Sequence, residues 1–195
     1  MRRLRDWRSI QAQAGLTMTE LLITMLIAGI LMGIGLPSYR YITYSNRVST
    51  EVNSLLGDLQ YARSEAVREG WMITVCPSSN GTSCTPSGTS WQNGWILFQD
   101  VNTNQSVAAN SNILRVRGKF TSNPQDTFVS DNSMSSVSFN REGFVSGFPA
   151  SATSNYVTFT LHTTPQKTDW TRCLQLFSTG TAATQRTTDA QGNCS

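Results

Sequence analysis

The chain opens with a polar segment that is followed directly by a long apolar one. Residues 1–15 are basic and polar, whereas residues 21–36 read LLITMLIAGILMGIGL and contain a single polar side chain, a threonine. A helix from Leu16 to Leu36 would measure roughly 31 Å, which is enough to cross a hydrocarbon core of about 30 Å. The pattern therefore predicts a membrane-spanning helix, which we place over residues 16–43.

The order of these segments differs from that of an ordinary secretory signal. Such a signal carries small residues and a cleavage site after its apolar run. Here Leu36 is followed by Pro37, Ser38, Tyr39 and Arg40. We expect the apolar helix to stay in the mature protein.

Beyond this helix the chain switches to an amphipathic helical pattern over residues 44–69. Apolar residues recur at spacings of three and four, which predicts a stripe that packs on the chain's own domain: Val48, Val52, Leu55, Leu59, Ala62 and Ala66. We place the charged residues between them mainly on the solvent side: Arg47, Glu51, Asp58, Arg63, Glu65, Arg68 and Glu69. Gly70 is the predicted C-cap, and Pro37 predicts a kink in the long helix.

Residues 70–195 are typical of a β-rich domain with turns of Gly, Asn, Ser and Pro. The expected strands are 71–76, 94–98, 113–117, 137–140, 144–146, 156–161 and 173–177, with loops over 78–90 and 99–112. Asn140–Gly143 predicts a hairpin turn. The fold class is therefore α+β, with a long N-terminal helix packed on an antiparallel β-rich domain over residues 44–195.

The basic character of the chain lies almost entirely in its first 15 residues. The formal net charge is +3, and residues 1–15 alone carry four arginines and one aspartate, while the remaining 180 residues carry 11 basic and 11 acidic side chains. Basic residues before the apolar run predict that the N-terminus stays in the cytoplasm and the rest is exported.

Four cysteines lie in Ser-, Thr- and Gly-rich surroundings and form no CxxC motif: Cys76, Cys84, Cys173 and Cys194. An even number in an exported chain predicts two disulfides. Three pairings are possible, and we favour Cys76 with Cys84 and Cys173 with Cys194 because each closes a short loop.

One carboxylate, Glu20, lies at the edge of the apolar run. An unpaired charge costs on the order of a few kcal/mol at the centre of a bilayer and less near its surface. Glu20 either lies at the headgroup level without a further role or waits for a positive partner. A free α-amino group is the natural candidate.

Residues 15–22, GLTMTELL, resemble the type IV prepilin motif. That family has a short basic leader, a Gly before the cut, usually Phe at the first mature position and Glu at the fifth. With Leu16 as the first mature residue, Glu20, Gly29 and Pro37 fall where these pilins commonly carry the same residue types. Leu16 itself departs from the usual Phe.

The resemblance implies that a membrane prepilin peptidase cuts between Gly15 and Leu16 and that Leu16 is then N-methylated. In filaments of this family the Glu at this position pairs with the N-terminus of a neighbouring subunit, so Glu20 is the implied assembly residue. Pro37 is implied to be where the helix bends or melts on packing. The cut would also remove all of the net positive charge.

Three further stretches are similar to the FimT/FimU and GspH group of minor pilins and pseudopilins: YARSEA over 61–66, WQNGWILF over 91–98 and FNREGF over 139–144. The resemblance covers most of the mature chain, is closest to FimU-type minor pilins and implies a low-copy subunit that initiates or caps a filament. It implies other minor and major pilins and the prepilin peptidase as partners. It also implies the bacterial inner membrane, with a periplasmic domain, and then the pilus on the cell surface.

Catalysis finds little support in the sequence. The single histidine, His162, excludes a multi-histidine metal site, and no nucleophile, phosphate-binding or zinc-protease motif occurs. We expect no enzyme activity, no metal and no cofactor. Four tryptophans could form a ligand platform, although packing is the commoner role: Trp71, Trp91, Trp95 and Trp170.

Some FimT-type relatives take up DNA with arginines in a Gly-Arg-x-Arg pattern near the C-terminus. The comparable stretch here, 179–186, keeps the glycine but has only Arg186, with Arg172 upstream. Because residues 16–195 are neutral in sum, we do not expect strong phosphate binding.

The leading hypothesis is a minor pilin of the priming or tip complex of a type IV pilus, with twitching and adhesion as its context. The alternatives are a GspH-like pseudopilin of a type II secretion system and a DNA-uptake pilin.

Overall fold

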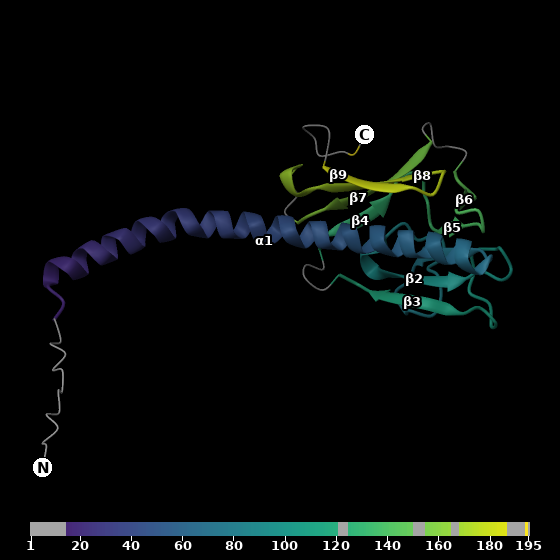
Figure 1. Ribbon diagram of the computed structural model, residues 1–195, viewed down its shortest axis with the longest axis horizontal. Helices are drawn as coiled ribbons and strands as arrows, with labels where there is room; N and C mark the ends of the chain where they lie inside the picture. Colours follow the sequence, from purple (N-terminus) through teal and green to yellow (C-terminus); the bar gives the residue numbers. More distant parts are fainter. Residues whose placement is uncertain (1–14, 121–124, 150–154, 165–167, 187–193, 195) are drawn as a thin grey trace, which may run out of the picture. The chain divides into compact units, whose positions relative to one another are not determined.

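The computed structural model describes residues 15–120, 125–149, 155–164, 168–186 and 194 (Figure 1). One helix, α1 (Met18–Glu69), precedes two antiparallel sheets. The chain divides into two compact units, Met1–Ile42 and Thr43–Ser195, and α1 runs through the boundary between them. The predicted helix is thus present, and it is helical through Pro37 without ending there; a kink at that residue stays a prediction.

The first sheet has the strand order β3-β2-β1-β5-β6. Its strands are β1 (Ile73–Pro77), β2 (Gly94–Gln99), β3 (Ile113–Gly118), β5 (Val137–Phe139) and β6 (Val145–Ser146). Strand β1 lies in the centre and pairs Ile73 with both Gln99 of β2 and Phe139 of β5. A short 3₁₀ helix, η1 (Trp91–Asn93), leads into β2.

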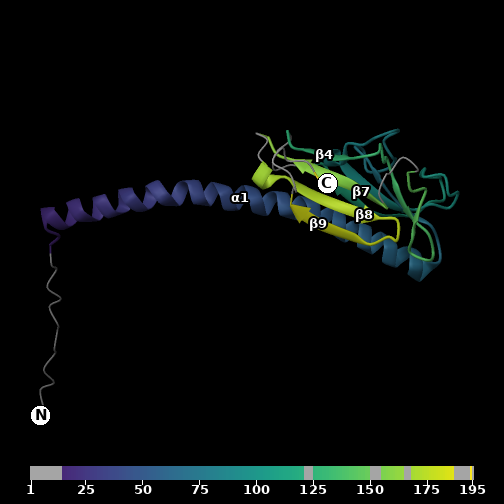
Figure 2. The same ribbon diagram turned by 90° about the horizontal axis from the view of Figure 1, so that it is seen from above.

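The second sheet has the order β4-β7-β8-β9, and Figure 2 shows these strands side by side. They are β4 (Thr127–Ser130), β7 (Tyr156–His162), β8 (Arg172–Phe177) and β9 (Ala182–Arg186), with the 3₁₀ helix η2 (Thr168–Trp170) before β8. A single bridge between Ser90 and Val129 joins the segment before η1 to β4.

The core of the second unit lies where α1 packs against both sheets. The predicted apolar stripe of the helix is fully buried: Val48, Val52, Leu55, Leu59, Ala62 and Ala66. It shares one cluster with Trp91 of η1 and with Trp95, Phe128 and Phe159 of the sheets. On β2, Trp95 and Leu97 face this cluster, while Ile96 and Phe98 belong to a smaller one with Cys76. Because both faces of β2 are covered, its sequence is continuously apolar.

The C-terminal end of α1 is fixed as the sequence predicts. Gly70 adopts φ +71°, and its N–H donates to the carbonyl of Ala66 at 3.0 Å. A left-handed residue directly after the last turn ends a helix, and glycine adopts that conformation without steric cost. The helix prediction is confirmed at this end.

Of the nine strands in the part of the chain that the structure describes, the sequence predicted seven and missed β4 and β9. Strand β9 reads AATQR and has few of the β-branched and aromatic residues that mark strands. Strand β4 has only four residues. A second prediction was wrong: Asp58, Glu51 and Glu65 are buried rather than on the solvent side of the helix. Asp58 is covered because Trp95, Arg115 and Arg117 of the first sheet reach it, whereas Glu65 pairs with Arg68 of the same helix.

Candidate functional site

The apolar segment is the most distinctive surface of the first unit. Every described side chain from residue 15 to residue 35 is exposed in the isolated chain. The segment is long and apolar enough to cross a membrane, with a mean hydropathy of 2.1 over its most apolar window. A contiguous apolar surface of this kind marks a membrane or protein interaction site.

The helix start at this segment has a defined cap that the sequence reading overlooked. Thr17 precedes α1, and its Oγ1 accepts the N–H of Glu20 at 3.3 Å. Thr17 and Glu20 stand three residues apart, as in a capping box, in which a glutamate or glutamine at the third helical position can cap the chain start in return. Glu20 also lies in the first turn, where a negative charge favours the helix dipole. The structure thus gives Glu20 a local stabilising role besides the predicted assembly role.

The predicted cleavage site lies outside the helix. Gly15, Leu16 and Thr17 precede the first helical residue, Met18, and a Cβ added at Gly15 would meet nothing within 4 Å. The Gly15–Leu16 bond is therefore not locked in helical hydrogen bonds. Residues 1–14 of the predicted leader lie outside the described residues.

A buried carboxylate joins the helix to the first sheet in the second unit. Asp58 is 1% exposed and accepts hydrogen bonds from Trp95 Nε1 at 2.9 Å, Arg115 Nη1 at 3.1 Å and Arg117 Nε at 3.3 Å. The Arg115 guanidinium also stacks on the ring of Tyr61, 3.7 Å from its centroid. Three donors satisfy the carboxylate, so this centre holds the fold together and leaves no acid for chemistry.

A second set of contacts fixes the first turns of α1 in this unit. Arg47 forms an ion pair with Asp126, whose side chain is fully buried. Tyr44 stacks on Trp170 with ring centroids 4.6 Å apart. Arg172 donates to Ser45 Oγ at 3.0 Å. Together these contacts anchor residues 44–47 to the second sheet and to the loop before β4.

The structure pairs Cys76 with Cys84 and Cys173 with Cys194, with Cα atoms 5.6 and 5.7 Å apart. The first bond ties the loop after β1 back to that strand. The second ties Cys194, the last residue but one, to β8. This is the pairing that the sequence favoured among three.

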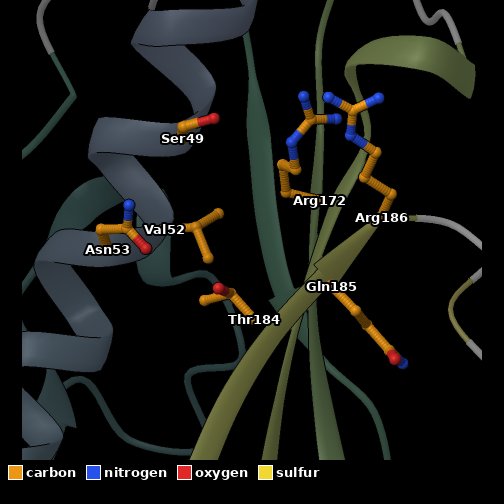
Figure 3. Close-up of a pocket in the computed structure, with 7 residues that line it drawn as sticks. All are labelled: Ser49, Val52, Asn53, Arg172, Thr184, Gln185 and Arg186. Carbon is orange, nitrogen blue, oxygen red and sulfur yellow. The ribbon is translucent and has the colours of Figure 1, made fainter.

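A pocket of about 240 Å³ opens between α1 and the paired strands β8 and β9 (Figure 3). Ser49, Val52, Asn53, Arg172, Thr184, Gln185 and Arg186 line it. The strand register sets Arg172 directly opposite Arg186, and Figure 3 shows both guanidinium groups pointing the same way. The two arginines that the sequence singled out are therefore neighbours.

Only one of these arginines is available at the surface. Arg172 is buried, and its Nη1 donates to the carbonyls of Asp169 and Thr171 at 2.9 and 3.0 Å. Arg186 is exposed and forms no ion pair within the described part of the chain. DNA binding draws its affinity from several lysine and arginine contacts to phosphates. A single exposed arginine beside neutral side chains gives no such row, so this pocket does not favour nucleic acid.

The tryptophans and the histidine that the sequence singled out differ in how far they are buried. Trp91 and Trp95 are completely buried, Trp170 is 8% exposed, and Trp71 is 48% exposed. His162 ends β7 half-buried, and burial lowers its pKa. Among the residues that the structure describes, no three His, Cys, Asp or Glu side chains group as metal ligands. Packing is thus the role of three tryptophans, and Trp71 is the exception.

Comparison with known proteins identifies a matching family and two similar structures. The sequence model of the family described as type II transport protein GspH matches residues 51–180. Two crystal forms of the type IV minor pilin FimU of Pseudomonas aeruginosa are similar in structure. The first has a TM-score of 0.57 and 23% sequence identity over 79% of this chain and 99% of that one; the second has 0.52 and 23% over 75% and 99%. No curated protein sequence matches the chain significantly.

Proposed function

Because the chain belongs to the GspH family of type II transport proteins, we propose that it is a minor pilin, built into a type IV pilus through its N-terminal helix and acting in the priming or tip complex. The fold is that of a pilin, a long N-terminal helix with antiparallel sheets packed on its second part. The family comprises pilin-like subunits. The pilus, the complex and the partners, other minor and major pilins, are our inference.

The observation that carries the proposal is the apolar surface of residues 16–35 with the single carboxylate Glu20 in its first turn. Before assembly the bilayer covers this surface, with the N-terminus in the cytoplasm and the second unit in the periplasm, where disulfides form. In a filament, the helices of neighbouring subunits cover it. The globular unit has its own core, and its buried carboxylates Asp58 and Asp126 pair with arginines inside it, so it can pass from one setting to the other without refolding.

Cleavage after Gly15 supplies what Glu20 lacks. The new α-amino group of Leu16 is the only positive charge that processing would create near the apolar run. A buried carboxylate and a buried amine both lose hydration, and their attraction offsets this cost only when the geometry is good. Pairing between adjacent subunits therefore sets the register of the helices. Leu16 would be methylated and remain positively charged.

The test separates the assembly role of Glu20 from its helix-capping role. Glu20→Gln keeps a side chain that can complete the capping box but removes the charge. We expect both Glu20→Ala and Glu20→Gln to be cleaved normally and to be strongly depleted from sheared filaments. Thr17→Ala, which removes the cap acceptor and keeps the charge, is the matched control and should assemble. If Glu20→Gln enters filaments like the wild type, the charge is not needed and the proposal fails.

A pseudopilin of a type II secretion system is the second candidate, and the description of the matching family favours it. Both candidates use the same helix and the same processing. A deletion strain discriminates between them: loss of pili and twitching with normal enzyme secretion supports the minor pilin, whereas loss of secretion with normal pili supports the pseudopilin. The neighbouring genes give the same information more cheaply.

A further inference from the structure

Trp71 is the tryptophan that packing does not explain. Its side chain is 48% exposed, and within the described part of the chain it makes no hydrogen bond and no ring contact. Large aromatic side chains are usually buried for most of their surface, and an exposed one at a hollow surface is a common feature of binding sites. The surroundings of Trp71 show what it could bind.

The topology of the first sheet sets Trp71 between two loops. Trp71 stands two residues before β1, whose first residue, Ile73, pairs with the last residues of β2 and β5, Gln99 and Phe139. The segments that follow those two strands therefore flank Trp71. They border a cavity of about 300 Å³, which we call the Trp71 cavity; Asp100, Asn140, Arg141 and Glu142 line it beside Trp71.

Both loops that wall the cavity are held by their own hydrogen bonds. The Asp100 carboxylate accepts the N–H groups of Asn104 and Gln105 at 3.2 and 2.7 Å and the Thr74 hydroxyl at 3.1 Å. On the other side, Asn140 Oδ1 accepts the N–H groups of Glu142 and Phe144 at 3.1 and 2.8 Å. The walls are thus formed before any ligand arrives, which lowers the entropy cost of binding.

The two exposed charges at the rim of the Trp71 cavity cancel. Arg141 Nε donates to Glu142 Oε1 at 2.8 Å, and both side chains are exposed at the rim. The Asp100 carboxylate is buried and used within its loop. Neither an anion nor a cation is therefore favoured as the ligand. A wholly apolar ligand is disfavoured as well, because it would cover the charged pair and remove its hydration.

A flat apolar surface beside an array of donors and acceptors suits a sugar ring. One face of a hexose carries C–H groups that can lie on an indole, and its edge carries hydroxyls that can bond to a guanidinium and a carboxylate together. We propose that the Trp71 cavity binds one neutral hexose at the end of an oligosaccharide, stacked on Trp71 with its hydroxyls on Arg141 and Glu142. The volume lies at the low end of about 300–1,000 Å³ for ligand pockets, which fits one ring.

The test uses the full-length protein in a detergent that has no sugar headgroup, because a glucoside or maltoside would compete. A panel of neutral oligosaccharides is titrated while saturation-transfer NMR reports ligand contact and tryptophan fluorescence reports the indole. We expect weak binding of at least one neutral sugar, lowered about tenfold or more in Trp71→Ala. Trp71→Phe should keep part of it. Val116→Ala removes another exposed apolar side chain, on β3, and should bind like the wild type.

Two results would overturn the proposal. One is that no neutral sugar binds at sugar concentrations up to about 10 mM, a range in which even a millimolar dissociation constant can be measured. The other is that Trp71→Ala, with an unchanged near-ultraviolet dichroism spectrum for its buried aromatic residues, binds as the wild type does. None of these readouts depends on filament assembly, so the proposal stands or falls apart from the minor pilin role.

Discussion

Replacement of Asp58 by alanine tests how the helix is joined to the first sheet. The change leaves Trp95 Nε1 without its acceptor in a position where the tryptophan is completely buried. An unsatisfied buried donor costs about 1–3 kcal/mol. Arg115 and Arg117 are 46% and 49% exposed, so water can replace the carboxylate and each lost ion pair adds at most about 1 kcal/mol. The expected loss is about 2–4 kcal/mol.

Conservative and single-partner variants show which contact matters. Asp58→Asn keeps a carbonyl oxygen for Trp95 and loses only the ion pairs, so it should cost about 1 kcal/mol. Arg115→Gln should cost about as little. Thermal unfolding of the unit Thr43–Ser195, followed by circular dichroism, should show Asp58→Ala melting roughly 5–15 °C lower than the wild type. If Asp58→Ala lowers the free energy of unfolding by less than about 1 kcal/mol, or by no more than Arg115→Gln does, the unsatisfied Trp95 donor is not the main cause of the loss.

Three further predictions concern glycine, histidine and DNA. Gly180→Ala places a Cβ at 2.1 Å from the Gly143 carbonyl oxygen at φ +80° and should lower stability by roughly 2–4 kcal/mol. Gly57→Ala, on the open face of α1, should instead raise stability by about 0.5–1 kcal/mol. Melting temperatures equal to that of the wild type would contradict both predictions. Burial lowers the pKa of His162, so the unfolded chain takes up its proton first, near pH 6.5. Stability is then complete above that pH and falls as the pH drops toward 5, and His162→Gln should flatten this slope. In gel shifts the second unit should not retard DNA at physiological salt; salt-sensitive binding at about micromolar concentration would revive the DNA-uptake reading.

The sequence predicted those parts of the fold that a periodic pattern encodes. The stripe from Val48 to Ala66 and the glycine cap at Gly70 follow from local rules that the structure obeys. Strand β9 was missed because AATQR carries no strong strand signal and is a strand only through its pairing with β8. Pairing across the sheet, rather than local preference, decides such segments.

The polar centres were harder to foresee than the core. Asp58 falls on the charged side of the helix pattern, and its burial depends on Trp95, Arg115 and Arg117, which are 37 to 59 residues away in sequence. Likewise Trp71 was grouped with three core tryptophans, because only the strand order shows that it lies between two loops. Arg172 and Arg186 were singled out separately, and the register of β8 and β9 makes them neighbours. Side chains that meet across long sequence separations leave no local pattern.

The N-terminus of the mature protein is the most direct test of the account. The protein should be purified from its own host and measured by intact mass and by mass spectrometry of its N-terminal peptide. We predict a chain that begins at Leu16 with one added methyl group, and an intact mass that accounts for two disulfides. A chain that still begins at Met1 would contradict the filament account because Glu20 would lack its amine. A chain cut after Leu36 would contradict it because both Glu20 and the apolar helix would be removed.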